Sequence, residues 1–212
     1  MYALRTARAA TGRKAIAKIE GGYHGGYDAL TVSVKPGLDE AGPEEAPVPV
    51  TPQDGEAGTV HVVPYNDIER LDAILAEHAG TIACVFVEPV LENLGIVLPD
   101  AGYLAAVREA CDRHGVLLVF DEVKTGLTAG YGGASERLGV KPDLVTLAKS
   151  IGGGLPLAAF GGKAEVMAAV VDNRMPHFGT YNGNPLVMAA AQAVDEVCTR
   201  EALAAAESVN VA

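Results

Sequence analysis

Continuous apolar runs along the chain predict strands that are buried on both faces. The clearest runs are residues 82–87 (IACVFV), 116–120 (VLLVF) and 144–148 (LVTLA), and weaker candidates are residues 16–20 and 157–160. Amphipathic stretches of helical length lie between them. Because strands that alternate with helices of about 10–15 residues form βαβ units, we expect an α/β fold. It would be a three-layer sandwich with a mostly parallel sheet and helices on both faces.

The ends of two predicted helices are marked by residues that suit those positions. Apolar residues recur at helical spacing in residues 4–10, and Gly12 is expected to end that helix. A second helix is predicted over residues 67–78, with Asn66 as its N-cap and Glu69 in the capping-box position. A tight glycine-rich loop is expected directly after the first strand, at residues 21–26.

Two further helices are predicted later in the chain. One covers residues 101–113, and the other begins with Asn184 as N-cap and Pro185 at its first position and runs to about residue 198. Its apolar side chains are expected to pack in the core; they are Val187, Ala190, Ala191 and Val194.

Composition and charge narrow the classes of partner. The chain has 212 residues, 49% of them hydrophobic and 20% charged, which suits one globular domain or one and a half. Its 16 basic and 27 acidic residues give a net charge of −11. Because that charge repels phosphate backbones and anionic lipid, we expect neither nucleic acid nor a membrane surface as a partner.

Cysteine usage indicates a reducing compartment. The three cysteines lie far apart and form no CxxC pair, so neither a disulfide scaffold nor a metal site is expected. No apolar run approaches the about 18 residues that a membrane span needs, and the N-terminus lacks the pattern of a signal peptide. We therefore predict a soluble cytoplasmic protein.

Functional groups come directly after three of the predicted strands. Glu88 comes after the first of the clear runs, Asp121 and Glu122 after the second, and Lys149 after the third. In open α/β sheets, ligands bind outside the carboxyl ends of the strands. These side chains are therefore expected at one edge of the sheet.

A lysine and a carboxylate at the same edge favour one kind of cofactor chemistry. The common phosphate-binding motifs, the HExxH pair and the serine-hydrolase elbow are all absent from the sequence. A lysine in a dry site loses its proton more readily and attacks a carbonyl to form a Schiff base. An aspartate nearby pairs with a protonated pyridine nitrogen. Lys149 and Asp121 thus suit pyridoxal 5′-phosphate.

Several short motifs extend this interpretation. They are FDEV at 120–123, TG at 125–126, PDL at 142–144, AK at 148–149, GGGLP at 152–156, EGGYHG at 20–25, VEPV at 87–90 and GTYNGNP at 179–185. In this order and spacing the sequence resembles the class III (fold type I) pyridoxal phosphate-dependent aminotransferases. The segment AFGG at 159–162 is most similar to the glutamate-1-semialdehyde 2,1-aminomutase branch.

The resemblance implies a role for each motif residue at the cofactor. Lys149 would carry the aldehyde of the cofactor and then move a proton between the substrate carbon and the cofactor. Asp121 would pair with the pyridine nitrogen. Tyr23 would stack on one face of the ring, and Val123 would pack on the other.

Other residues would complete the site. Asn93 would lie near the phenolic oxygen of the ring, and Thr180 would bind the cofactor phosphate of a neighbouring subunit, which implies a homodimer. Glu88 and His24 would support the cofactor-binding residues without taking part in the reaction.

The resemblance also implies how the chain is divided. Residues 1–200 would form a partial cofactor-binding large domain, in which residues 35–59, rich in proline, glycine and acid, make a long surface loop. Residues 201–212 would begin a connection to a small C-terminal domain. The turn that holds the cofactor phosphate in this family would precede Met1.

Two hypotheses for function remain open at this point. One is amino-group transfer on a small amino-acid or amino-aldehyde substrate, by either an aminomutase or a transaminase. The other is a non-catalytic fragment, or a subunit of a split enzyme that needs a partner for the phosphate-binding turn and the small domain.

Overall fold

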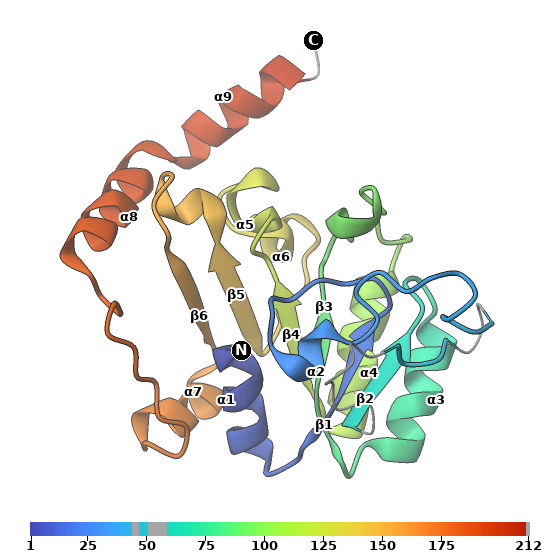
Figure 1. Cartoon of the computed structure of the whole chain (residues 1–212). Coiled ribbons are helices and arrows are strands. Elements are labelled where there is room, and N and C mark those ends of the chain that lie inside the picture. Colours follow the sequence, from blue (N-terminus) through green and yellow to red (C-terminus); the bar gives the residue numbers. More distant parts are fainter. Residues whose placement is uncertain (44–46, 51–58, 211–212) are drawn as a thin grey trace.

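A six-stranded sheet in the order β2-β1-β3-β4-β5-β6 forms the centre of the molecule (Figure 1). The computed structural model describes residues 1–43, 47–50 and 59–210. The first five strands are parallel, and β6 runs antiparallel to β5 at one edge. In chain order the strands are β1 (Ala15–Ile19), β2 (Val60–Val63), β3 (Ile82–Val87), β4 (Leu117–Asp121), β5 (Leu144–Ala148) and β6 (Ala158–Gly162).

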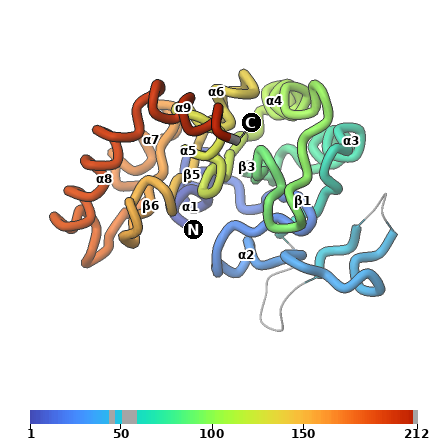
Figure 2. The backbone as a smooth tube through the Cα atoms, turned by 90° about the horizontal axis from the view of Figure 1, so that it is seen from above, coloured from blue at the N-terminus to red at the C-terminus, as the bar shows by residue number. Residues whose placement is uncertain are grey.

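Helices cover both faces of this sheet. In chain order the described helices are α1 (Tyr2–Thr11), α2 (Asp28–Thr31), α3 (Ile68–His78), α4 (Tyr103–His114), α5 (Thr125–Thr128), α6 (Gly133–Arg137), α7 (Ala164–Val171), α8 (Pro185–Val197) and α9 (Arg200–Asn210), with the short 3-10 helices η2 (Glu92–Leu94) and η3 (Lys149–Gly152). One apolar core joins the sheet to α3 and α4, and the other joins it to α1, α2 and α7. Seen from above, α2 lies across the sheet from α3 and α4 (Figure 2). The predicted three-layer α/β sandwich is therefore confirmed.

The strand predictions are confirmed with one omission. The runs 82–87 and 144–148 are strands with the predicted bounds, and every residue of β1 and β3 is buried, as expected for central parallel strands. β6 covers the weak candidate at 157–160 and forms the antiparallel edge. The omission is β2, which comes directly after the predicted loop 35–59. Residues 35–43 and 47–50 of that loop contain no helix or strand, and residues 44–46 and 51–58 lie outside the described residues.

The predicted capping box at the start of α3 is wrong. The N-cap is Asp67, whose side chain accepts a hydrogen bond from the Arg70 amide at 2.8 Å. Since the helix begins one residue later than predicted, Glu69 is not at the capping-box position. Asn66 instead has a left-handed backbone (φ 66°) and accepts a hydrogen bond from the Asp100 amide at 2.9 Å. It therefore ties the start of α3 to the loop before α4.

The predicted end of α1 and the predicted start of α8 are confirmed. Gly12 ends α1 with a left-handed backbone (φ 71°), and the Asn184 side chain accepts hydrogen bonds from the amides of Leu186 and Val187. The core role predicted for the apolar residues of α8 is wrong, because no side chain of this helix is fully buried. The helix lies beyond the β6 edge and packs against η3, so the rest of its surface stays open.

Residues 200–210, which follow α8, form a further helix, α9. It extends away from the sheet in Figure 1. Arg137 in α6 pairs with Glu207, and Arg200 pairs with Glu136, both at 2.7 Å. These exposed pairs contribute little stability each. Among the described residues, no helix combines the length and the apolar character that crossing a bilayer requires.

A buried carboxylate, Asp143, joins three elements at the amino end of β5. It accepts hydrogen bonds from the Leu118 amide at 2.7 Å and from Arg108 in α4 at 2.9 Å, and it pairs with Lys163 after β6 at 2.7 Å. Burial raises the pKa of this carboxyl, but the bonds to Lys163, the Leu118 amide and Arg108 outweigh it and hold the pKa below its usual value. Asp143 therefore favours the folded state as a carboxylate.

Replacing Asp143 by asparagine should lower the free energy of unfolding by about 3 kcal/mol, because it leaves two cations without their buried partner. Because the folded pKa is depressed, the stabilisation is present above the unfolded pKa of about 3.9 and is lost as the pH falls through the folded pKa. Urea unfolding at pH 7 and pH 3 measures both effects. The matched control, Asp172→Asn, breaks an exposed pair at 4.0 Å and should change stability by about 0.5 kcal/mol or less. Equal losses of unfolding free energy in Asp143→Asn and Asp172→Asn would contradict this role of Asp143.

Candidate functional site

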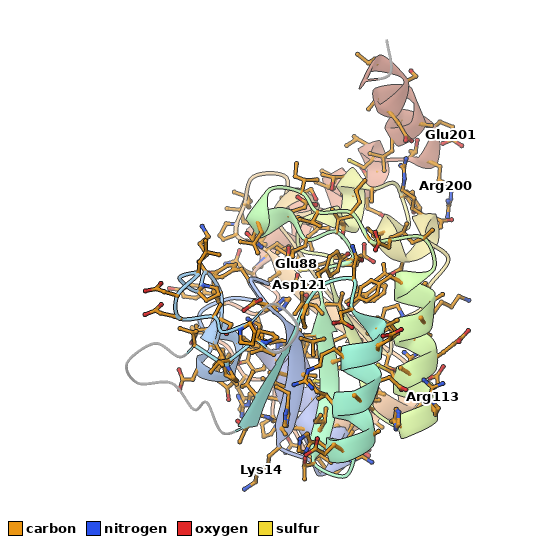
Figure 3. The ribbon with its side chains drawn as sticks, turned by 90° about the vertical axis from the view of Figure 1, so that its right-hand side faces the viewer. Lys14, Glu88, Arg113, Asp121, Arg200 and Glu201 are labelled. Atoms are coloured by element: carbon orange, nitrogen blue, oxygen red, sulfur yellow. The ribbon has the colours of Figure 1, made fainter. Side chains whose placement is uncertain are left out.

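A cavity of about 1120 Å³ opens at the carboxyl ends of β4 and β5. Its walls come from those strand ends, the loop after β1, the start of β6, and α8. Seven of the eight predicted site residues line it, and Thr180 does not; the seven are Tyr23, His24, Glu88, Asn93, Asp121, Val123 and Lys149. Glu88 and Asp121 lie at the same end of the sheet in Figure 3. The edge of the sheet predicted from the sequence is therefore the edge that holds the cavity.

Asp121 is the last residue of β4 and is 8% exposed. One carboxylate oxygen lies 2.8 Å from Nδ1 of His24, and the other accepts a hydrogen bond from the Val123 amide at 3.1 Å. Burial raises the pKa of this carboxyl, but the hydrogen bond and charge of His24 and the hydrogen bond from the Val123 amide hold it below its usual value. Asp121 is therefore ionised at neutral pH.

His24 fixes the orientation of the Asp121 carboxylate. The imidazole is buried, and its ring packs against Phe86 with centroids 5.3 Å apart. Since its Nδ1 faces the Asp121 carboxylate, the ring limits how that carboxylate can rotate. Within the described parts of the chain, Nε2 of His24 has no hydrogen-bond partner.

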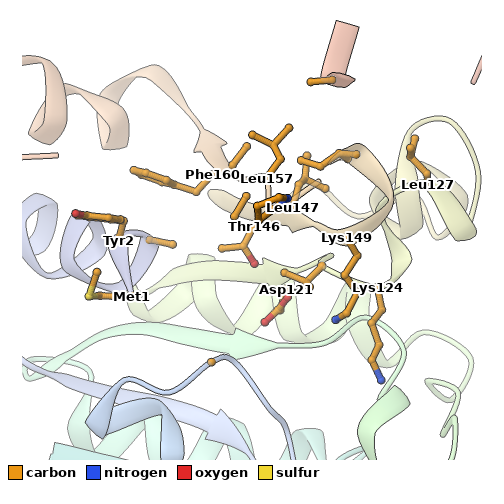
Figure 4. Close-up of a pocket in the computed structure, with 18 of the residues that line it drawn as sticks. Met1, Tyr2, Asp121, Lys124, Leu127, Thr146, Leu147, Lys149, Leu157 and Phe160 are labelled. Carbon is orange, nitrogen blue, oxygen red and sulfur yellow. Dashed lines mark hydrogen bonds between the residues drawn. The ribbon is translucent and has the colours of Figure 1, made fainter. Parts of the chain in front are cut away.

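Lys149 lies directly after β5, at the start of η3. Its backbone is left-handed (φ 52°), a conformation that costs a residue with a side chain about 1 kcal/mol or more and that clusters at functional sites. Asp121 and Lys149 both project into the cavity in Figure 4. The dry environment expected for this lysine is not found: its side chain is exposed, because none of the described residues closes the cavity over it.

Glu88 holds the cavity wall together rather than facing its centre. It is 4% exposed, and one oxygen accepts hydrogen bonds from the Tyr23 amide at 2.9 Å and from the Asn93 side chain at 2.8 Å. The other oxygen accepts from the Glu92 amide at 3.3 Å. Glu88 thus fixes the loop after β1 and η2 against each other, and Tyr23, on that loop, is 48% exposed and lines the cavity.

Glu122 turns away from the cavity, although it comes directly after Asp121. Its carboxylate accepts hydrogen bonds from the amides of Ala134 at 2.6 Å and Ser135 at 3.0 Å, at the start of α6. The approach is so close that a Cβ at Gly133 (φ 65°) would lie 2.2 Å from the Glu122 carboxylate. Successive residues at a strand end point to opposite sides, so only Asp121 faces the cavity.

Three residues at or below this site were not predicted from the sequence. Lys124 and Thr146 line the cavity, and Lys18 lies under the loop that carries Tyr23. Lys18 is fully buried in β1, and its amine donates hydrogen bonds to the carbonyls of Gly22 (2.8 Å), Leu30 (3.5 Å) and Val32. A single lysine inside an otherwise apolar strand is the signal that could have revealed it.

Burial lowers the pKa of Lys18 to about 8, against the opposing charges of Glu88 and Glu20. The unfolded value is about 10.4, so between these values the unfolded chain binds more protons and stability rises with pH. Replacing Lys18 by methionine removes this dependence. The stability advantage of the wild type over Lys18→Met should grow by about 2 kcal/mol between pH 7 and pH 10. Urea unfolding across this range measures it, with Lys141→Met, at an exposed lysine, as the control that stays parallel to the wild type. A stability difference between the wild type and Lys18→Met that does not change with pH would contradict the lowered pKa of Lys18.

The family comparison matches almost the whole chain. The family model described as class III aminotransferase matches residues 1–210. Curated relatives include the glutamate-1-semialdehyde 2,1-aminomutases of Rhodopirellula baltica, 45% identical over 194 residues, and of Methanocorpusculum labreanum, 46% identical over 197 residues. These alignments cover 91% and 92% of this chain but 44% and 47% of the relatives. The chain therefore spans less than half the length of these relatives.

Solved structures with the same fold include two kinds of protein. An omega-transaminase from Sphaerobacter thermophilus superposes with a TM-score of 0.85 at 37% identity, over 94% of this chain and 47% of that one. A glutamate-1-semialdehyde-aminomutase from Pseudomonas aeruginosa PAO1, in complex with PMP, superposes with a TM-score of 0.76 at 30% identity, over 94% and 46% of the two chains.

Proposed function

The chain belongs to the class III aminotransferase family, and we propose that it forms the pyridoxal phosphate-binding half of an enzyme that moves amino groups. The observation that carries this proposal is the convergence of Asp121 and Lys149. They lie at the ends of the adjacent strands β4 and β5 and project into one cavity. A structure described as a transaminase with PLP bound superposes on this chain with a TM-score of 0.84.

The residues around the cavity fit this cofactor. An ionised Asp121, oriented by His24, suits a protonated ring nitrogen, and the amine of Lys149 suits an aldehyde. The exposed ring of Tyr23 and the side chain of Val123 are available for the two faces of a planar ring. Asn93, held by Glu88, offers its amide near that ring. When bound, pyridoxal phosphate supplies a carbonyl that reacts with amines and a ring that withdraws electrons from the substrate carbon.

Each residue of the cavity would then have a separate role in the reaction. The Asp121 carboxylate would keep the ring nitrogen protonated, and His24 would keep that carboxylate aimed at the cavity. Lys149 Nζ would hold the cofactor and would move a proton at the reacting carbon of the substrate. Tyr23 and Val123 keep the ring in one plane, so that the reacting bond has a defined orientation.

The reaction we propose resembles that of glutamate-1-semialdehyde 2,1-aminomutase, the name carried by the curated relatives of this chain. Its substrate would be a small amino aldehyde or amino acid. The test supplies the full protein with cofactor and glutamate-1-semialdehyde, without any keto acid. An aminomutase forms the isomeric amino acid under these conditions. Turnover that needs an added keto acid would favour a transaminase, and no turnover with any donor and acceptor would contradict the proposal.

We also propose that the protein works as a homodimer, and the surface of α8 favours this assembly. Large apolar side chains are exposed on this helix and before it, among them Phe178 (75%), Tyr181 (82%), Leu186 (69%) and Val197 (66%). Exposed apolar patches of this kind usually mark interaction sites. We propose a second copy of the protein as the occupant, with Thr180, which is exposed beside this surface, serving the cofactor phosphate of the neighbour.

Replacing Leu186 by glutamate should weaken association of the chain, because it places a charge in the apolar contact. Light scattering after size-exclusion chromatography measures the molar mass, which should fall toward that of a monomer. Leu38→Glu is the control, since Leu38 is 97% exposed in the loop far along the chain from α8. A wild-type chain that is monomeric at all concentrations would contradict the proposed partner.

The net charge of −11 supports a protein that avoids nucleic acid and anionic membrane surfaces. All three cysteines are free, and two of them are buried. Free thiols are typical of a reducing compartment, which supports a cytoplasmic location.

A further inference from the structure

We propose that Lys124 forms an anion site in the cavity, which binds a carboxylate of the substrate at a distance from the reacting group. This inference rests on the proposed function of the cavity and names the class of substrate that it takes. That class is amino acids or amino aldehydes with a carboxylate in addition to the group that reacts.

The position of Lys124 is set by the rigid turn after β4. The Gly126 amide donates a hydrogen bond to the Glu122 carbonyl at 2.9 Å, and the Thr128 hydroxyl donates one to the Lys124 carbonyl. A Cβ at Gly126 would lie 2.7 Å from the end of the Leu147 side chain, so the turn packs closely on β5. The turn therefore holds Lys124 beside the strand that leads to Lys149.

The Lys124 side chain is half-buried and lines the same cavity as Lys149. In Figure 4 the two side chains extend in the same direction, and Asp121 lies to one side of them. In the proposed function the ring nitrogen of the cofactor lies beside Asp121, and the reacting carbon lies beside Lys149. An anion held by Lys124 thus lies on the substrate side of the cofactor.

The ammonium of Lys124 has no anionic partner in the described part of the chain, where it forms no ion pair. The buried carboxylates of the cavity already have hydrogen-bond partners. Asp121 is bonded to His24 and the Val123 amide, and Glu88 accepts from the Tyr23 amide and the Asn93 side chain. A lysine ammonium binds carboxylates as a point charge, and partial burial strengthens the attraction. Among the described side chains of the cavity, a carboxylate therefore meets one unpaired lysine besides the lysine that reacts, whereas the Met1 ammonium, which also lines the cavity, lies in the field of Asp121.

Competitive labelling of lysines tests this site directly. The chain, with and without pyridoxal phosphate, is treated with a small amount of acetic anhydride in the presence of glutarate or of its neutral analogue glutaramide. Peptide mass spectrometry then gives the acetylation rate of each lysine. Glutarate should slow the acetylation of Lys124 about tenfold, whereas glutaramide should not. The exposed Lys141 is the internal reference and should keep its rate.

Variants identify the charge as the cause. Calorimetry should show that Lys124→Gln weakens glutarate binding about tenfold, that Lys124→Arg retains it, and that neither changes the affinity for the cofactor. An acetylation rate of Lys124 that glutarate leaves unchanged overturns the proposal. Protection of Lys124 by pyridoxal phosphate alone also overturns it, because the anion would then be the phosphate of the cofactor.

The same labelling tests the proposed function and the anion site at Lys124 separately. If the cofactor fails to protect Lys149, the proposed function fails. Protection of Lys124 by glutarate in that case still supports the anion site, because the rate at each lysine is measured on its own.

Discussion

Replacing Lys149 by alanine should abolish the covalent retention of pyridoxal phosphate and reduce amino transfer by about 10⁴-fold or more. The reason is chemical. In the cavity Lys149 is the amine placed beside Asp121, and its left-handed backbone directs it there at a cost in conformational energy. An alanine leaves neither an amine to hold the aldehyde nor a base to move the proton.

Absorption spectroscopy measures this loss, since the visible band of the protein-bound cofactor should appear in the wild type and be missing in Lys149→Ala. Lys124→Ala is the matched control, because Lys124 is a second lysine of the same cavity, and it should keep the band. Wild type and Lys149→Ala with the same band would contradict the assignment of Lys149.

Replacing Asp121 by asparagine should reduce amino transfer by about 10²- to 10³-fold. Asparagine has nearly the same shape, but it carries no charge to keep the ring nitrogen protonated, so the ring withdraws electrons less effectively. The depressed pKa of Asp121 means that the wild type keeps this charge throughout the neutral range. The substitution also leaves the buried His24 beside a neutral amide.

Single-turnover kinetics with an amino donor measures the chemical step without product release. The matched control is Asp195→Asn, which removes an exposed carboxylate from the α8 wall of the same cavity and should change the rate less than about threefold. Equal effects of the two substitutions would show that Asp121 acts only through the general charge of the cavity.

Much of the fold could be predicted because buried parallel strands have a simple pattern. The runs 82–87 and 144–148 are apolar or nearly so throughout, and they form strands with those bounds. The positions of Asp121 and Lys149 could be predicted from the same pattern, since each comes at the carboxyl end of such a strand. The motifs that resemble the family lie at these strand ends and in the loops beyond them.

The features that were missed depend on contacts distant in sequence. β2 has only four residues and is defined by its pairing with β1. Asn66 and Asp67 are both good N-caps, and the contact of Asn66 with Asp100 decides between them. Lys18 is held by carbonyls that come near it only after the loop 21–32 has folded over β1. The apolar face of α8 looks like a core face in the sequence, but among the described residues it meets no further element that would bury it.

Trapping of the cofactor by reduction tests the central claim most directly. Sodium borohydride fixes pyridoxal phosphate to the amine that holds it, and tandem mass spectrometry of the peptides then identifies the labelled lysine. The geometry of the cavity predicts one label per chain, at Lys149, in the wild type and in Asp121→Asn, because that variant keeps the Lys149 amine. A label at Lys124 or Lys18, or no label at saturating cofactor, would contradict it.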